Sequence, residues 1–155
     1  MNQLDSHHRT LALALLARAR DLTLASQRAD GAPHATTISF ASDALEIYAA
    51  IGIDSQKAHN VRRDGRVALT VNAPYQDWSQ IQGLSMEGVA EILSEPDQVR
   101  RAGELLLARF PQFAKFVANT ETVPWPGMLY IRIVPHSVAV LDYTQGFGHT
   151  THFTL

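Results

Sequence analysis

A chain of 155 residues with 46% apolar and 18% charged side chains has the composition of one globular domain, spanning residues 1–155. Its formal net charge of −2 argues against general nucleic-acid binding, and its lack of cysteine excludes disulfides, zinc–thiolate sites and cysteine nucleophiles. The longest apolar run, residues 11–17, is too short to span a bilayer. We therefore expect no membrane partner and, by default, a cytoplasmic protein.

The first part of the chain predicts a helix followed by three strands. Residues 4–21 begin with the possible caps Asp5 and Ser6 and carry a helical stripe of leucine and alanine. Three segments rich in β-formers follow, separated by short turns, and they predict an antiparallel meander. These segments are 21–28, 33–41 and 45–51.

The middle of the chain predicts a short helix between strands. Residues 55–64 fit the helix, and residues 66–73 fit a buried fourth strand. Residues 81–93 predict a long fifth strand that contains Gly83 and Gly88. Glycines inside a strand are typical of bulges or sharp bends, as at the corners of a barrel.

The last third predicts one more helix and the final strands. In residues 94–110, Ser94 and Asp97 resemble a capping box, and Phe113, Phe116 and Val117 indicate one further turn. The remaining segments are two strands over 128–134 and 137–143 and a glycine-containing tail over 144–155. Many strands with few helices predict a mainly β fold, a small barrel with helical additions.

Basic side chains gather around the short helix, although the chain is mildly acidic. Ser55, Gln56 and Lys57 supply a hydroxyl, an amide and an ammonium where a helix start favours an anion, so they fit a phosphate. On the pattern alone, a solvated helix face is the simpler interpretation, because charged residues are mostly exposed. Four of the 13 basic residues share this stretch: Lys57, Arg62, Arg63 and Arg66.

The arrangement resembles the FMN-binding split barrel of the pyridoxamine 5′-phosphate oxidase-like superfamily over about residues 20–117. The resemblance lies in "DGAPHATTISFA", "LEIYAAI", "SQKAHNVRRDGRVALTV" and "MEGVAEIL", followed by a helix. It implies a six- to seven-stranded antiparallel split β-barrel with an N-terminal helix and a helix inserted after the fifth strand. It also implies a homodimer with FMN at the subunit interface.

The resemblance assigns candidate cofactor-binding residues. The family's phosphate contact corresponds to Ser55, Gln56 and Lys57, with Gln56 in place of an arginine, so one cation is missing. Arg62 and Arg63 flank the site or reach a neighbouring chain, unless one pairs with an aspartate. The strand residues beside the flavin correspond to Thr36, Thr37, Ile38, Ala49 and Ala50. Thr36 and Thr37 face opposite sides of a strand, so only one side chain can face a flavin.

The C-terminus departs from the vitamin oxidases. The chain ends "YTQGFGHTTHFTL" and lacks the tail that grips substrate phosphate in those enzymes. We therefore predict an FMN-dependent oxidoreductase that acts on another small molecule, and identify no catalytic residue. The alternative is a flavin- or haem-binding protein without turnover, and a deazaflavin is a third possibility. His149 and His152 are three residues apart, but we predict no metal site.

Aromatic residues near the chain's loops leave several interpretations open. Tyr75 and Trp78 could stack on a flavin, plug a barrel end or form a dimer seam. Phe147 and His149 in the tail could close over a cofactor at a dimer interface. Trp125, between two prolines, is more typical of packing.

Overall fold

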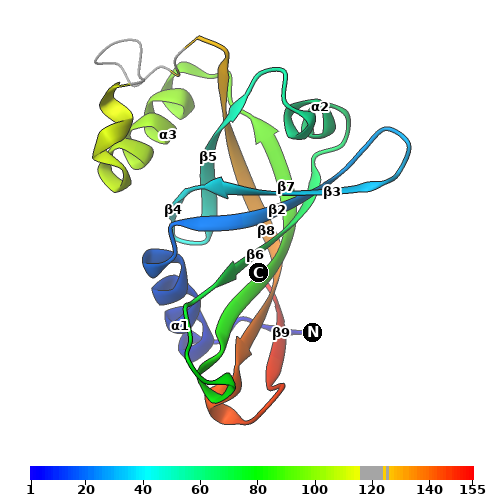
Figure 1. Ribbon diagram of the computed structural model, residues 1–155, viewed down its shortest axis with the longest axis vertical. Helices are drawn as coiled ribbons and strands as arrows, with labels where there is room; N and C mark the ends of the chain where they lie inside the picture. The colour runs from blue at the N-terminus through cyan, green and yellow to red at the C-terminus, as the bar shows by residue number, and fades with distance from the viewer. Residues whose placement is uncertain (116–123, 125) are drawn as a thin grey trace.

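A nine-stranded sheet curls into an open barrel in the computed structural model, which describes residues 1–115, 124 and 126–155 (Figure 1). The turn predicted at Phe116 and Val117 and the packing role predicted for Trp125 fall outside the described residues. The strands are β1 Asn2–Gln3, β2 Asp21–Gln27, β3 Pro33–Ser39, β4 Ala41–Asp43, β5 Glu46–Gly52, β6 Arg66–Asn72, β7 Gln82–Ile92, β8 Met128–Asp142 and β9 Thr150–Thr154.

Three α-helices accompany the sheet in the described residues: α1 Ser6–Arg18, α2 Gln56–Arg63 and α3 Pro96–Arg109. Three short 3-10 helices are η1 Trp78–Gln80, η2 Pro111–Lys115 and η3 Tyr143–Gln145. The predicted fold class, a mainly β split barrel with an N-terminal helix and a helix inserted after the long strand β7, is confirmed. The count of six to seven strands was too low because β1, β4 and β9 are short.

The three-strand meander predicted for the first half is wrong. β2 pairs with β3 and β6, whereas β5 pairs with β4 and β8. The chain changes direction at Phe40, whose ring is fully buried between β3 and β4. β4 then carries the chain to the other edge of the barrel, which is why the barrel is split.

The last two predicted strands are one continuous strand, β8. Its first half pairs with β5, its second half with β9, and both halves pair with β7. Pro135 lies between the two predicted strands and pairs with Gly88 at the register shift between β7 and β8, a place where a strand tolerates proline. Gly88 therefore marks a bulge, as predicted.

Capping explains where two helices begin. Asp5 caps α1, as predicted, by accepting a hydrogen bond from the backbone N–H of His8 at 2.9 Å. The capping box predicted at Ser94 is wrong, because Glu95 precedes α3 and makes no side-chain cap. Pro96 supplies the first helical turn instead, where its missing N–H costs nothing.

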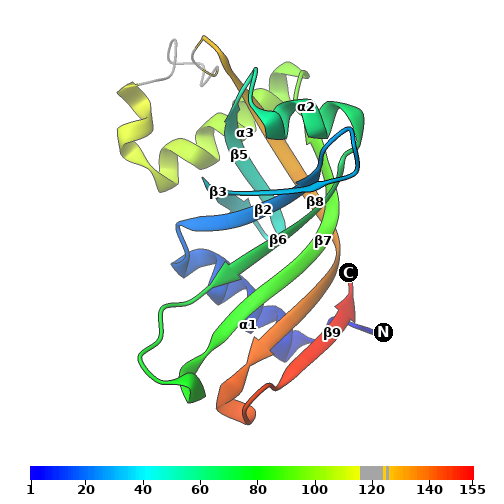
Figure 2. The same cartoon turned by 45° about the vertical axis from the view of Figure 1, so that its right-hand side comes forward.

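Two apolar clusters stabilise this arrangement. The main core fills the barrel and includes Leu15 and Leu16 of α1. A smaller cluster, which includes Leu106 and Tyr130, packs α3 against the outside of β5 and β8. The two termini lie side by side because β1 pairs in parallel with β9 (Figure 2). None of the helices in the described residues is long and apolar enough to cross a membrane.

Candidate functional site

The start of helix α2 is set by Ser55. Its hydroxyl accepts a hydrogen bond from the backbone N–H of Ala58 at 3.2 Å and donates one to the backbone oxygen of Gly52 at 2.7 Å. This is an N-cap interaction, and it confirms the predicted helix start. The Ser55 side chain is thereby committed to holding the loop between β5 and α2.

A buried polar contact fixes α2 on the sheet. Asn60 is fully buried, and its side-chain amide lies 3.0 Å from the Ser26 hydroxyl and 2.8 Å from the Gln56 amide. Ala58 and Val61 bury the same face of the helix. This attachment turns Gln56 toward Asn60 and leaves Lys57 on the side facing the barrel opening.

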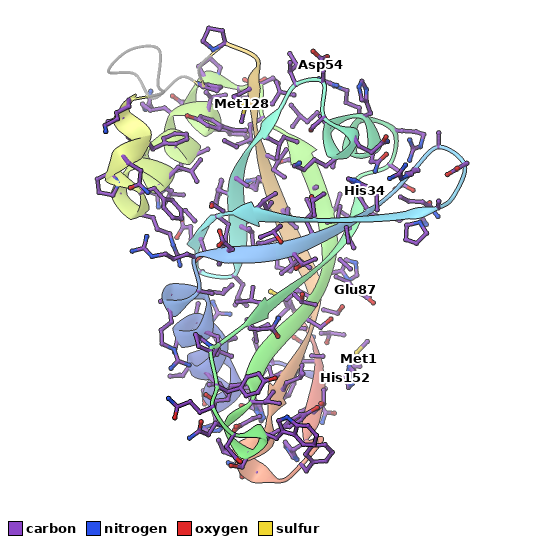
Figure 3. The ribbon with its side chains drawn as sticks, in the orientation of Figure 1. Met1, His34, Asp54, Glu87, Met128 and His152 are labelled. Carbon is purple, nitrogen blue, oxygen red and sulfur yellow. The ribbon has the colours of Figure 1, made fainter. Side chains whose placement is uncertain are left out.

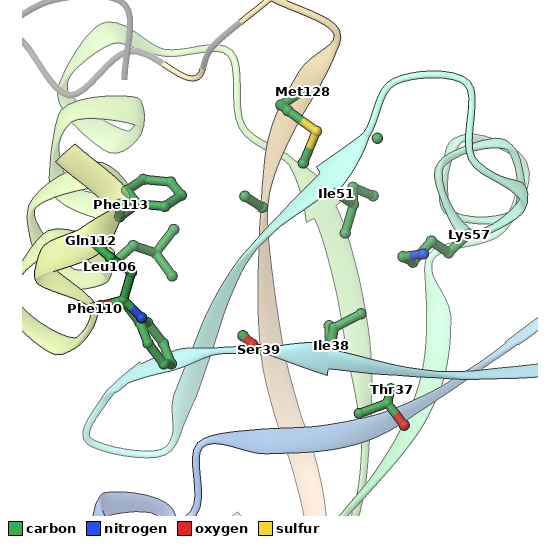
Figure 4. Close-up of a pocket in the computed structure, with 12 residues that line it drawn as sticks. Thr37, Ile38, Ser39, Ile51, Lys57, Leu106, Phe110, Gln112, Phe113 and Met128 are labelled. Atoms are coloured by element: carbon green, nitrogen blue, oxygen red, sulfur yellow. The ribbon is translucent and has the colours of Figure 1, made fainter. Parts of the chain in front are cut away.

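A cleft of about 510 Å³ lies between α2 on one side and α3 with η2 on the other (Figure 4). Such a volume is typical of small-molecule sites. Thr37, Ser39 and Gln112 are the uncharged polar residues of the lining, and Lys57 adds the one charge among the described lining residues. The Ser39 hydroxyl donates to the Asp21 carboxylate at 2.8 Å. The apolar side chains in the lining include Ile38, Ile51, Leu106, Phe110, Phe113 and Met128.

Lys57 reaches into this cleft from α2. Within residues 1–115, 124 and 126–155, it makes no ion pair and no side-chain hydrogen bond. Lys57 is half-buried, and a lysine without a carboxylate partner is available to an anion.

The other basic residues of the cluster have partners. Arg62 donates to the backbone oxygen of Ile53 at 2.9 Å, and Arg63 donates to the backbone oxygen of Gln27. These bonds tie α2 to its flanking loop and to β2. Arg66 pairs with Asp64 at 2.6 Å, and its hydrogen bonds lower the pKa of the Asp64 carboxyl to about 2. Arg66 is therefore part of an ion pair that supports the start of β6.

The candidate residues of β3 and β5 divide between the cleft and the interior. Thr37, Ile38 and Ala50 line the cleft, whereas Ala49 is fully buried in the core. Thr36 has the same inward direction as Ile38, and its hydroxyl oxygen is buried without a hydrogen-bond partner in the described structure. Thr36 is not among the residues that line the cleft, so this hydroxyl lies in the interior.

Sequence reasoning missed two features of this region. His34 lies two positions before Thr36 beneath α2, and its buried Nδ1 also lacks a partner in the described structure (Figure 3). The alternation of β3 could have revealed it, since residues two apart share a face. The wall formed by Phe110, Gln112 and Phe113 depends on how α3 docks on the barrel, which no local pattern reveals.

An aromatic corner, defined as Trp78, Tyr143 and Phe147, stands at the far end of the sheet from α2 (Figures 1 and 2). Trp78 and Phe147 remain 65% and 76% exposed although their ring centroids are 5.8 Å apart. The proposed plug of a barrel end is therefore wrong for Trp78. The segment around Phe147 cannot cover the cleft of its own chain either, because it lies at the opposite end.

The described lining of the cleft holds few side chains that suit acid–base catalysis or metal binding. Among the described lining residues of the cleft there is no histidine, aspartate or glutamate. Three or more potential metal ligands do not come together anywhere in the described part of the chain. The described lining of the cleft thus offers contacts and hydrogen bonds to a ligand.

Comparisons with known proteins agree with this geometry. The sequence profile of pyridoxamine 5′-phosphate oxidase matches residues 11–138. The conserved hypothetical protein Rv2991 of Mycobacterium tuberculosis is 27% identical, with a TM-score of 0.74 over 97% of this chain and 93% of its own. No curated protein matches the chain.

Two further solved structures share the fold alone. A protein of Listeria innocua, proposed to be a pyridoxamine 5′-phosphate oxidase, is 24% identical with a TM-score of 0.68, over 87% of this chain and 98% of its own. A heme binding protein of Mycobacterium smegmatis is 16% identical with a TM-score of 0.78, over 99% of this chain and 60% of its own.

Proposed function

Because this chain belongs to the pyridoxamine 5′-phosphate oxidase family, we propose that it binds FMN in the cleft between α2 and α3 and acts as an oxidoreductase on a small molecule. The observation that carries the proposal is the Lys57 side chain, a charge without a partner in the described structure that enters an otherwise uncharged cleft. A phosphate ester supplies the missing negative charge.

The residues present fit such a cofactor. Lys57 would hold the phosphate. Ile38 and the small Ala50 present an apolar floor on which a flat ring can lie. Gln56 turns toward Asn60, so the chain offers fewer charges to the phosphate than the family's arginine would.

Bound FMN supplies one- and two-electron redox chemistry. The chain's own contribution is to bind and to orient, since the described lining of the cleft offers no acid or base near neutral pH. Protons that accompany the electrons would then exchange with water at the open side of the cleft. This restricts the proposal to hydride or electron transfer and leaves out reactions that need a protein acid.

We further propose that the protein works as a homodimer with the cofactor at the subunit interface, in the cytoplasm. The exposed aromatic corner supports a dimer, because exposed tryptophan and phenylalanine rings are typical of protein interfaces. A partner's corner could also supply the cover that Phe147 cannot provide within its own chain. No observation favours haem, since no histidine is among the described lining residues.

The identity of the cofactor is the direct test. The protein is purified, denatured, and its released cofactor identified by absorbance and mass. We expect FMN. A Soret band would support the haem alternative, the mass of a deazaflavin would support the third candidate, and a colourless protein that does not take up FMN would contradict the proposal.

Lys57→Ala tests the phosphate assignment. We expect FMN affinity to fall at least tenfold, about 1.4 kcal/mol, because the phosphate loses its cation. Riboflavin, which has no phosphate, should bind the variant and the natural protein equally. Titration by flavin fluorescence measures both.

Lys115→Ala is the matched control, since Lys115 is the chain's other lysine and lies outside the cleft lining. It should leave both affinities unchanged. An unchanged FMN titration for Lys57→Ala would remove the phosphate assignment.

A further inference from the structure

Resting on the proposed function, we infer that the second reactant at this cleft is an uncharged, flat, apolar molecule. It would bind against a wall formed by Leu106, Phe110, Gln112 and Phe113, which we name the α3–η2 wall. This wall faces Lys57 across the cleft (Figure 4).

The α3–η2 wall is apolar and well supported. Leu106 and Phe110 are buried, and the ring of Phe113 lies 6.2 Å from that of Tyr130, centroid to centroid. Tyr130 itself is almost fully buried, which raises the pKa of its hydroxyl to about 12 and keeps it neutral. The wall thus presents aromatic surface to the cleft, and flat rings gain from contact with such surface.

Two arginines lie near this wall without lining the cleft. Arg109 donates to the backbone oxygens of Leu16 and Ala17 at 2.9 and 3.3 Å, and its guanidinium lies 4.8 Å from the Phe40 ring centroid. Arg20 lies 5.7 Å from the centroid of the Phe110 ring. Neither arginine is among the described lining residues. Arg109 therefore caps the end of α1 and does not serve the cleft.

The charge distribution decides the substrate class. If Lys57 neutralises the cofactor phosphate, the described lining holds no second charge for an anionic or cationic substrate. Such a substrate would lose water without gaining a partner, which is unfavourable. An uncharged ring suffers no such cost, and Gln112 can still donate one hydrogen bond to it. Phosphorylated vitamins are thereby disfavoured as substrates.

The test compares two redox-inert probes that share one ring system. 2-Naphthol is uncharged at neutral pH, whereas naphthalene-2-sulfonate carries a full negative charge. Equilibrium dialysis against FMN-saturated protein measures the binding of each. We expect 2-naphthol to bind at least tenfold more tightly.

Two variants assign this preference to the wall. Gln112→Arg adds a cation and should raise naphthalene-2-sulfonate affinity at least tenfold. Phe113→Ala should weaken the binding of 2-naphthol severalfold, and by more than it weakens the binding of FMN. Circular dichroism checks that each variant folds, and Gln112→Lys replaces Gln112→Arg if that variant does not.

The two proposals fail in distinguishable ways. Failure to bind FMN would overturn the proposed function and this inference with it. FMN binding together with equal affinities for the two probes, or a preference for the sulfonate in the natural protein, would overturn the inference alone. So would a preference for 2-naphthol that Gln112→Arg and Phe113→Ala leave untouched.

Discussion

The two ends of the barrel carry opposite kinds of surface. At one end, α2, β3, β5 and α3 enclose a concave cleft that Lys57 enters from one side. At the other end, η1 and η3 present the rings of the aromatic corner outward. A concave site with one unpartnered charge suits a small anion, whereas a convex group of exposed rings suits another protein surface.

Both ends are built rigidly, which makes the contrast informative. Asp77 and Gln80 form a capping box around η1, and Asp142 accepts hydrogen bonds from Gln82 and Thr144 beside η3. The hydrogen bond between Asn60 and Ser26 holds α2 in place in the same way. Rings and charges that are held in place while remaining available are typical of binding sites.

Gly88→Ala should have the largest effect, because Gly88 of β7 lies opposite the bulge of β8, the long strand that joins the two ends. A Cβ there would lie 2.5 Å from the backbone oxygen of Val134 and 2.8 Å from Cα of Pro135. Backbone atoms cannot move aside cheaply, so we expect the free energy of unfolding to fall by about 3 kcal/mol. Urea titration followed by circular dichroism measures this loss.

Gly52→Ala is the matched control for this substitution. Its added methyl group would meet Cβ of Ser55 at 3.6 Å, an ordinary contact. We expect little change in its urea midpoint. A Gly88→Ala protein as stable as the natural one would show that the bulge does not need glycine.

Asn60→Ala should affect the two ends of the barrel differently. It leaves the Ser26 hydroxyl buried without its partner, at a cost of about 2 kcal/mol. The Asn60 contact anchors α2 and does not touch η1 or η3. Amide hydrogen exchange should therefore accelerate in α2 and stay unchanged at η1 and η3. FMN affinity should fall as well, since Lys57 is then held less firmly.

Ser26→Ala should cost less, because Asn60 keeps its contact with Gln56. If hydrogen exchange in the Asn60→Ala protein accelerates equally at both ends of the barrel, the local role assigned to Asn60 is contradicted. It would indicate that the contact between α2 and β2 supports the whole barrel.

The elements of the fold were largely predictable, but their pairing was not. Alternation and capping identified α1, α2 and the strands β2, β3, β5, β6 and β7, since these depend on neighbouring residues. The meander failed because Phe40, which separates β3 from β4, resembles any apolar strand residue. The break predicted between residues 134 and 137 failed because Gly88, the partner of Pro135, is distant in the sequence. Pairing of distant strands leaves no local trace.

The site was predictable on one side only. Lys57, Thr37, Ile38 and Ala50 belong to segments whose order resembles the family, and all four line the cleft. The α3–η2 wall comes from a helix whose stripe predicted burial but not what it would face. The roles of Ser55 as a cap and of Arg63 as a tie to β2 depend on hydrogen bonds that a sequence pattern cannot assign.

The combined substitution Trp78→Ala and Phe147→Ala tests whether the aromatic corner is a protein interface, and it should have the smallest effect on folding stability. Both rings are largely exposed, so folding stability should change little while the proposed dimer loses its aromatic contacts. We expect the dimer dissociation constant to rise at least tenfold, about 1.4 kcal/mol, in analytical ultracentrifugation. Ile53→Ser removes an exposed apolar side chain beside α2 and serves as the control.

If the doubly substituted protein stays dimeric at every concentration at which the natural protein does, the corner is not part of the interface. If it loses FMN affinity together with the dimer, the partner's corner supports the cleft, and the two opposite surfaces then belong to one site.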